Sequence, residues 1–89
     1  MIERKLDVIK LIAQPYALNI LSALKKPKRY KDLKSVCKND RTLAKRIKVL
    51  KELELIEPIA LKEGGKYTNF YRLTKNGYLV LAEIEKLKL

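Results

Sequence analysis

The stretch of sequence that decides the fold runs from residue 38 to residue 56 and reads KNDRTLAKRIKVLKELELI. Within it, apolar side chains recur every three or four positions, at Leu43, Ile47, Leu50 and Leu53. This spacing indicates one face of an α-helix. Asn39 or Asp40 can cap that helix, because both side chains accept hydrogen bonds from the free N–H groups at a helix start. We therefore predict a helix over about residues 40–53, entered through a short polar turn.

Three shorter helices are expected before this turn. Their apolar residues recur at helical spacing, the first helix at Ile2, Leu6, Ile9 and Ala13, the second at Ala17, Ile20, Leu21 and Leu24, and the third at Tyr30, Leu33, Val36 and Cys37. Pro15 suits the first turn of the second helix, where its missing N–H group has no helical partner to lose. Pro27 ends that helix, because a proline ring blocks further helical turns.

From residue 56 onward the pattern becomes that of a β-hairpin. Ile59 and Leu61 lie two positions apart, as on one face of a strand, and Gly64-Gly65 suits a tight hairpin turn. Residues 67–73 are rich enough in aromatic and β-branched side chains to form the return strand. Pro58 confines the first strand to a sheet edge or to its own first residues, since proline donates no hydrogen bond.

A final helix is expected after the hairpin. Thr74 can cap this helix and Gly77 weakens its first turn, and its apolar face comprises Val80, Leu81, Ile84 and Leu87. The order helix, helix, helix, tight turn, helix, hairpin, helix is that of a winged helix-turn-helix, a mainly α fold with a two-stranded antiparallel wing and a C-terminal helix. The 89 residues are 47% hydrophobic, which suffices for one modest core, so we expect residues 1–89 to form a single domain.

Positive charge is concentrated in the middle of the chain. The formal net charge is +11, and residues 25–51 alone contain twelve Lys or Arg against two acids, a net charge of +10. Residues 52–89 carry six bases and six acids. A solvated lysine-rich face is the ordinary explanation of such a run, but its concentration in one folded segment favours a surface that binds a polyanion.

Three segments resemble parts of known winged helix regulators. Residues 13–24, AQPYALNILSAL, resemble the second helix of ArsR-type regulators, and residues 42–56 resemble their recognition helix and its exit into the wing. Residues 71–77, YRLTKNG, are similar to the strand-to-helix junction shared by the ArsR, MarR and HxlR families. The resemblance spans about residues 12–80. It implies a winged helix-turn-helix transcriptional regulator of the ArsR/MarR/HxlR type.

The sequence departs from these families at three points. No arginine follows Pro15 closely, and Glu54 stands where a glycine usually follows the recognition helix. Cys37 is the only cysteine and the chain has no histidine, whereas metal sensors of the ArsR type use paired Cys, or His with acids. A transition-metal sensor is therefore not expected.

The expected recognition helix carries three of its basic residues opposite its apolar stripe. At about 100° per residue, Arg41, Lys45 and Lys48 fall on the side away from the core, together with the acidic Glu52. Such a face is either merely solvated or fits the major groove, where it neutralises phosphates and reaches guanine edges. Arg41 lies nearest the helix start and is the leading candidate for reading a base, while Thr42 and Ala44 add hydroxyl and methyl contacts.

Two further groups of basic residues are expected to contact DNA. Lys62 and Lys66 flank the hairpin turn and can approach the minor groove or the adjacent backbone. The ordinary explanation of the Gly-Gly pair between them is a tight turn with no binding role. Arg29 and Lys31, together with Lys28, lie around the start of the third helix and are expected to hold phosphates. The aromatic residues of the C-terminal half are expected in the core or in interfaces rather than as base-stacking platforms: Tyr67, Phe70, Tyr71 and Tyr78.

The function that these features favour is sequence-specific binding of double-stranded DNA by a homodimer that regulates transcription. The last helix offers more apolar surface than a chain of this size easily buries, so the expected dimer contacts are Leu6, Ile9, Leu81, Ile84 and Leu87. Two alternatives remain open. One is a sequence-neutral nucleic-acid binder associated with chromatin or RNA, and the other is a winged helix that binds proteins.

Several classes of function are not expected. Without histidine or a paired nucleophile and base, the chain predicts no enzyme, no cofactor and no metal site. It shows no run of about 18 apolar residues that would span a membrane and no signal peptide, so we expect a cytoplasmic protein, nucleoid-associated in a prokaryote. Cys37 is expected in the core, with a redox switch as the minor alternative. The sequence identifies no small-molecule effector.

Overall fold

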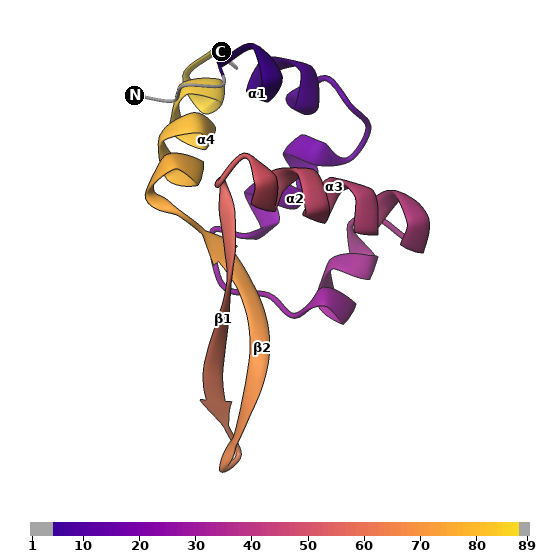
Figure 1. Ribbon diagram of the computed structural model, residues 1–89, viewed down its shortest axis with the longest axis vertical. Coiled ribbons are helices and arrows are strands. Elements are labelled where there is room, and N and C mark those ends of the chain that lie inside the picture. Colours follow the sequence, from indigo (N-terminus) through magenta and orange to yellow (C-terminus); the bar gives the residue numbers. More distant parts are fainter. Residues whose placement is uncertain (1–4, 88–89) are drawn as a thin grey trace.

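A computed structural model describes residues 5–87 and has the predicted winged helix-turn-helix architecture. The chain order is α1 (Lys5–Ile12), α2 (Ala17–Ala23), the 3₁₀ helix η1 (Tyr30–Ser35), α3 (Asp40–Glu52), β1 (Ile56–Glu63), β2 (Lys66–Leu73) and α4 (Lys75–Leu87). The helices form a compact body, and the β1–β2 hairpin projects from it as the wing (Figure 1). The predicted fold class, mainly α with a two-stranded antiparallel sheet, is confirmed.

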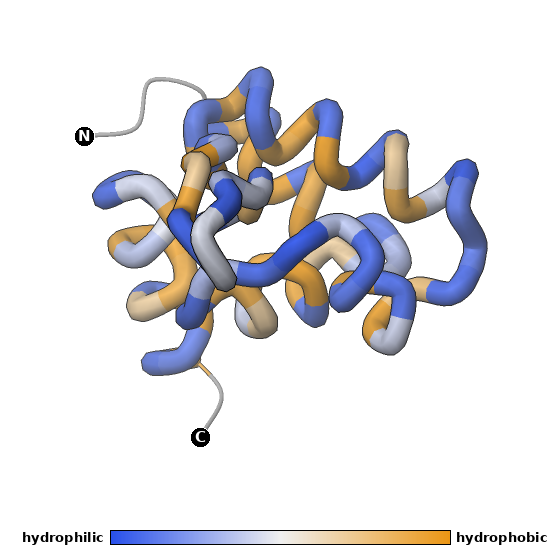
Figure 2. The backbone as a smooth tube through the Cα atoms, turned by 90° about the horizontal axis from the view of Figure 1, so that it is seen from below, coloured by the Kyte–Doolittle hydropathy of each residue, from blue (hydrophilic) through white to orange (hydrophobic). Residues whose placement is uncertain are grey.

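The hydrophobic core lies between the helices and the base of the wing. All four residues of the predicted α2 stripe are buried, and so are all four of the predicted α3 stripe: Leu43, Ile47, Leu50 and Leu53. Hydrophobic and hydrophilic segments alternate along the helical turns, as expected of helices that place one face in the core (Figure 2). Within residues 5–87, no helix is long and apolar enough to cross a bilayer.

The start of α2 differs from the prediction. Pro15 lies in the turn before the helix rather than in its first turn, and the helix begins at Ala17. Tyr16 is the reason, because its φ of 67° is left-handed and cannot belong to a right-handed helix. The Arg46 Nε atom donates a 2.9 Å hydrogen bond to the Pro15 carbonyl, so a side chain of α3 holds this turn.

The face of α1 that enters the core also differs from the predicted stripe. Val8 and Leu11 are buried, whereas Leu6 and Ile9 are 63% and 60% exposed. Ala13 lies beyond the helix end and is exposed, and Ile2 lies outside the described residues. The stripe is therefore a real apolar face of α1, but it points away from the core of this chain.

The predicted third helix is a single 3₁₀ segment, η1, with Leu33 and Cys37 buried beneath it. Its last turn closes with an i to i+3 hydrogen bond of 3.0 Å from the Val36 N–H to the Leu33 carbonyl. At its start, Arg29 and Asp32 form a capping arrangement, because the Arg29 N–H donates to the Asp32 carboxylate at 3.2 Å.

Helix α3 ends in a left-handed cap. The Leu55 N–H donates to the Leu50 carbonyl at 3.0 Å and the Glu54 N–H to the Lys51 carbonyl at 2.9 Å, which is the hydrogen-bond pattern of a Schellman motif. The residue in the left-handed position is Glu54, with φ of 59°. Glycine would adopt this conformation freely, whereas the Cβ atom of a glutamate makes it unfavourable. The Glu54 backbone conformation therefore lowers the stability of the fold.

The wing is a regular antiparallel hairpin. Its register runs from Ile56 opposite Leu73 to Glu63 opposite Lys66. Gly64 and Gly65 both have positive φ, as a two-residue hairpin turn requires. One pairing was not predicted: Lys28 forms an isolated antiparallel bridge with Tyr71, with N···O distances of 3.0 and 2.7 Å. This bridge fastens the base of the wing to the segment before η1.

Helix α4 is capped as predicted, since the Thr74 hydroxyl accepts a 3.0 Å hydrogen bond from the Gly77 N–H. Gly77 does more than weaken the first turn, because it is buried against the Leu55 carbonyl. Val80 and Leu81 enter the core, while Ile84 packs at its edge and Leu87 is 85% exposed.

Candidate nucleic-acid interface

The outward face of α3 carries the residues predicted to contact DNA. Arg41, Ala44, Lys45 and Lys48 are exposed, and Thr42 is half-buried. The face lies opposite the buried stripe of the same helix, as the sequence period predicted. Two turns of basic side chains therefore point into solvent from a helix whose other side is fixed in the core.

The start of α3 is held by three hydrogen bonds. The Asn39 side chain caps the helix by accepting a 3.0 Å bond from the Thr42 N–H, which confirms the predicted cap. The Tyr30 hydroxyl reaches the Asp40 carbonyl at 3.4 Å, and the Cys37 thiol the Asn39 carbonyl at 3.6 Å. Since η1 and the turn hold this end, the backbone that carries Arg41 has a defined position.

The cationic side chains of residues 25–51 divide into two groups. Five have partners within the protein: Lys25 with Glu85, Arg29 with Asp32 and Glu63, Lys34 with Asp40, Arg46 with the Pro15 carbonyl, and Lys51 with the Tyr71 ring. The side chains of the other seven make no hydrogen bond or ion pair with any residue of the described range 5–87: Lys26, Lys28, Lys31, Lys38, Arg41, Lys45 and Lys48. Only the seven free cations are therefore fully available to an external anion.

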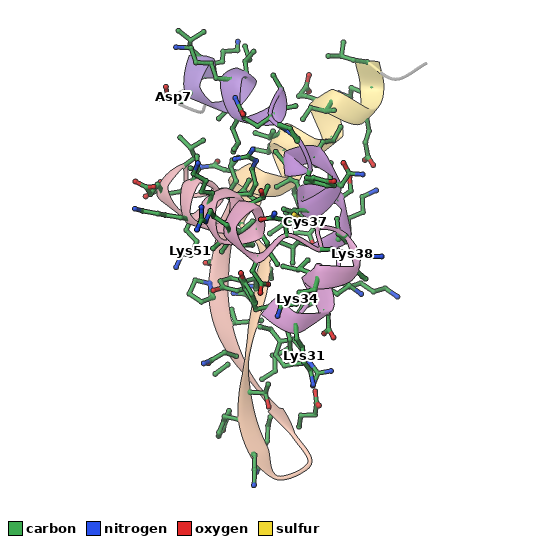
Figure 3. All side chains as sticks on the ribbon, turned by 90° about the vertical axis from the view of Figure 1, so that its right-hand side faces the viewer. Asp7, Lys31, Lys34, Cys37, Lys38 and Lys51 are labelled. Atoms are coloured by element: carbon green, nitrogen blue, oxygen red, sulfur yellow. The ribbon has the colours of Figure 1, made fainter. Side chains whose placement is uncertain are left out.

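The free cations centre on α3 and its flanks. Arg41, Lys45 and Lys48 lie on the helix itself, and Lys31 and Lys38 lie in the segment that precedes it. Along the long axis of the molecule, Lys31 and Lys34 lie between α3 and the wing tip (Figure 3). The sequence could not have shown that Lys31 is free and Lys34 is paired. Only the fold shows that the Lys34 ammonium lies 3.3 Å from the Asp40 carboxylate.

The wing tip exposes Lys62 and Lys66 on either side of its turn, as predicted. Space around the turn is open, because a Cβ atom added at Gly64 or Gly65 would meet no described atom within 4 Å. Tyr67, predicted to lie in the core or in an interface, is not a core residue, since it is 74% exposed beside Lys66. A hairpin this narrow has no second layer to cover an aromatic ring near its tip.

Arg29 has a different environment from the other predicted DNA contacts. Its guanidinium lies 3.2 Å from the Asp32 carboxylate through Nε and 3.8 Å from the Glu63 carboxylate. The hydrogen bond from the Arg29 side chain, followed by that from its backbone N–H, holds the pKa of Asp32 below its ordinary value. Sequence reasoning missed Glu63 because nothing local connects it with η1.

Cys37 lies fully buried behind the turn, which confirms its predicted place in the core. The turn that leads into α3 is therefore anchored by a core side chain. Among the described residues, no group of His, Cys, Asp and Glu could hold a metal ion.

A second surface lies at the end of the molecule opposite the wing tip, where α1 and α4 meet (Figure 1). A groove of about 460 Å³ there is lined almost entirely by apolar side chains, with Lys5 and Glu83 as its charged members. Exposed apolar residues line it: Ile9, Leu79 and Leu87. Leu6, on the same helix as Ile9, is also exposed. Of the predicted dimer contacts, Leu81 is misplaced, because it is 2% exposed and belongs to the core of its own chain.

The sequence of this chain matches a known protein family. Residues 11–89 match the family described as HxlR-like helix-turn-helix. No curated protein sequence matches significantly. Among solved structures, the reduced form of the transcriptional regulator YodB from B. subtilis is 24% identical with a TM-score of 0.81, covering 99% of this chain and 88% of that one.

Two further solved structures share the fold. A PadR family transcriptional regulator from Eggerthella lenta is 24% identical with a TM-score of 0.66, over 90% of this chain and 77% of that one. The transcriptional repressor BigR from Xylella fastidiosa is 19% identical with a TM-score of 0.67, over 90% of this chain and 78% of that one. At these identities the structural likeness establishes the common fold.

Proposed function

Because the chain belongs to the HxlR-like helix-turn-helix family, whose members are transcriptional regulators and not enzymes, we propose that it binds specific sites in double-stranded DNA as a homodimer. The observation that carries the proposal is the outward face of α3. There, Arg41, Lys45 and Lys48 are exposed and lack side-chain partners among residues 5–87. Cations that the fold leaves unpaired in one patch are available to phosphates and base edges.

In this proposal α3 lies in the major groove, which is wide enough for one helix. Arg41 is on the first turn, at the end that usually enters the groove, and reads a base through its guanidinium fork. Lys45 and Lys48 follow on successive turns and neutralise phosphates, while Thr42 and Ala44 supply hydroxyl and methyl contacts at the groove floor.

The wing and η1 hold the DNA backbone beside α3. Lys62 and Lys66 at the wing tip approach the minor groove or its phosphates, and Lys31 on η1 contacts the backbone. These side chains fix the position and orientation of the protein on the duplex without reading sequence. Arg29, predicted as a further backbone contact, is paired with Asp32 and Glu63 and is not assigned a phosphate here.

The homodimer forms through the apolar surface of α1 and α4. Leu6, Ile9, Ile84 and Leu87 belong to this surface, and Leu79 joins them in place of Leu81. Each copy contributes one domain of residues 1–89, and the two-fold axis matches an inverted repeat in the DNA. The site of action is the cytoplasm, on the nucleoid in a prokaryote.

Selection of bound sequences from a pool of random duplex DNA tests the proposal. We expect enrichment of an inverted repeat, whose half-sites reflect the two copies of α3. Tight binding without any enriched sequence would contradict sequence-specific regulation and would favour a sequence-neutral nucleic-acid binder.

A further inference from the structure

The outer part of the wing is connected to the helical body by one polar contact. At its base the hairpin is fastened by the Lys28–Tyr71 bridge and by Lys51, whose Nζ lies 6.0 Å from the centre of the Tyr71 ring. Beyond Tyr71, the ion pair of Arg29 with Glu63 is the only hydrogen bond or ion pair in the described chain that joins the hairpin to the helical body. Arg29 and Glu63 therefore occupy a distinct position in the fold.

Arg29 is held in place before it reaches Glu63. Its neighbour Lys28 is paired with β2 through both backbone atoms, so the Arg29 backbone begins beside the wing. The Asp32 carboxylate then accepts from the backbone N–H and from Nε of Arg29, both at 3.2 Å. With Nε engaged by Asp32, the outer nitrogen Nη1 faces the Glu63 carboxylate at 3.8 Å.

Glu63 lies in a place where a free carboxylate would harm the proposed function. It is the last residue of β1, next to Lys62 and directly opposite Lys66 in the register. An uncompensated negative charge between the two lysines proposed to bind phosphate would repel the DNA backbone. It would also pair with those lysines and so compete with the phosphates.

We propose that Arg29 is a positioning residue that acts on DNA binding through Glu63, holding the wing tip toward the body and neutralising its carboxylate, and that it ligates no phosphate itself. This inference rests on the proposed DNA-binding function. Both side chains are partly exposed, 33% for Arg29 and 56% for Glu63, so the pair contributes little to folding stability. Its loss should change DNA affinity and wing order without lowering the melting temperature.

A double-mutant cycle on DNA affinity tests the inference. We expect Arg29→Ala to weaken duplex binding about three- to fivefold, and to have almost no effect when Glu63→Gln is already present. Arg72→Ala is the matched control, because it removes one positive charge and an Arg–Glu pair with Glu57 at the wing base. That control should change binding by the same factor with and without Glu63→Gln.

The opposite result would identify Arg29 as a phosphate ligand. In that case Arg29→Ala would cost at least as much affinity in the Glu63→Gln background, since an arginine freed from Glu63 binds phosphate better. The slope of log affinity against log salt would also fall by about one, which corresponds to the loss of one phosphate contact. Either outcome overturns the positioning role while leaving the DNA-binding function intact.

Wing order in the free protein provides a readout that needs no DNA. We expect the ¹H–¹⁵N heteronuclear NOE of the Gly64 and Gly65 amides to fall in Arg29→Ala and in Glu63→Gln, with no further fall in the double variant. Unchanged values would overturn the inference. If the wild-type protein bound no duplex, the proposed function would fail, and this measurement would decide only whether Arg29 and Glu63 order the wing.

Discussion

The Cα atom of Gly77 lies against the backbone carbonyl of Leu55, so closely that a Cβ atom would overlap the carbonyl oxygen. The same carbonyl accepts a 3.0 Å hydrogen bond from the Thr74 N–H, and the Thr74 hydroxyl donates to the Glu54 carbonyl at 2.6 Å. These contacts join the first turn of α4 to the exit of α3. The direction of α4 is thereby fixed relative to α3.

Replacing Gly77 with alanine should therefore destabilise the protein, although alanine is the better helix former. The added Cβ must displace the Leu55 backbone, and forced overpacking of this kind costs about 1 to 3 kcal/mol. Urea unfolding measures the loss. Asn76→Ala, on the neighbouring residue, should change stability far less. Equal stability of Gly77→Ala and wild type would show that the junction between α3 and α4 yields without cost.

Glu54→Gly should have the opposite effect. Glycine adopts the left-handed conformation at this position without a Cβ clash, so we expect a gain of about 0.5 to 1 kcal/mol in unfolding free energy. Lys48→Gly in the exposed middle of α3 serves as the comparison and should lose about 1 kcal/mol. A loss of stability for Glu54→Gly would mean that the glutamate side chain contributes more than its backbone conformation costs.

Local patterns predicted the elements, because periodicity, caps and turn residues act over a few positions. The α3 stripe, the Asn39 cap and the Gly64-Gly65 turn belong to this class. Which face of α1 enters the core could not be predicted from its sequence. Val8 and Ile9 are both apolar and adjacent, so only tertiary packing decides that Val8 enters the core and Ile9 remains exposed.

The candidate site was predictable as a helix face but not as a set of free charges. Arg41, Lys45 and Lys48 followed from their position opposite the α3 stripe. The partners of Arg29 and Lys28 did not follow, because Glu63 and Tyr71 are distant in sequence and approach only after the wing folds back. Leu81 was misplaced for a similar reason, as an apolar period does not separate core from interface.

Assembly should depend on the apolar surface of α1 and α4. Ile9→Glu or Leu79→Glu places a charge on that surface, so sedimentation should show a dimer for the wild type at micromolar concentration and a monomer for either variant. Leu61→Glu on the wing should leave the dimer intact. Leu81→Ala should instead lower folding stability by about 2 to 5 kcal/mol, as expected of a core leucine. A monomeric wild type would contradict the proposed dimer.

The salt dependence of binding should distinguish free cations from engaged ones. Counterion release makes log affinity fall linearly with log salt, and removing one phosphate contact reduces the slope by about one. We expect this reduction for Lys45→Ala and for Lys48→Ala. Lys25→Ala, whose lysine is paired with Glu85 at 2.6 Å, should leave the slope unchanged. Identical slopes for all three variants would argue against the α3 face as the contact surface.

Arg41→Ala tests most directly whether α3 reads DNA sequence. Arg41 is exposed on the first turn of a capped helix, so its removal should leave the fold intact. Affinity should be measured for the preferred duplex and for a scrambled duplex at the same salt concentration. We predict a loss of about 1 to 3 kcal/mol on the preferred site and a smaller loss on the scrambled one. Equal losses on both duplexes would contradict base reading by Arg41.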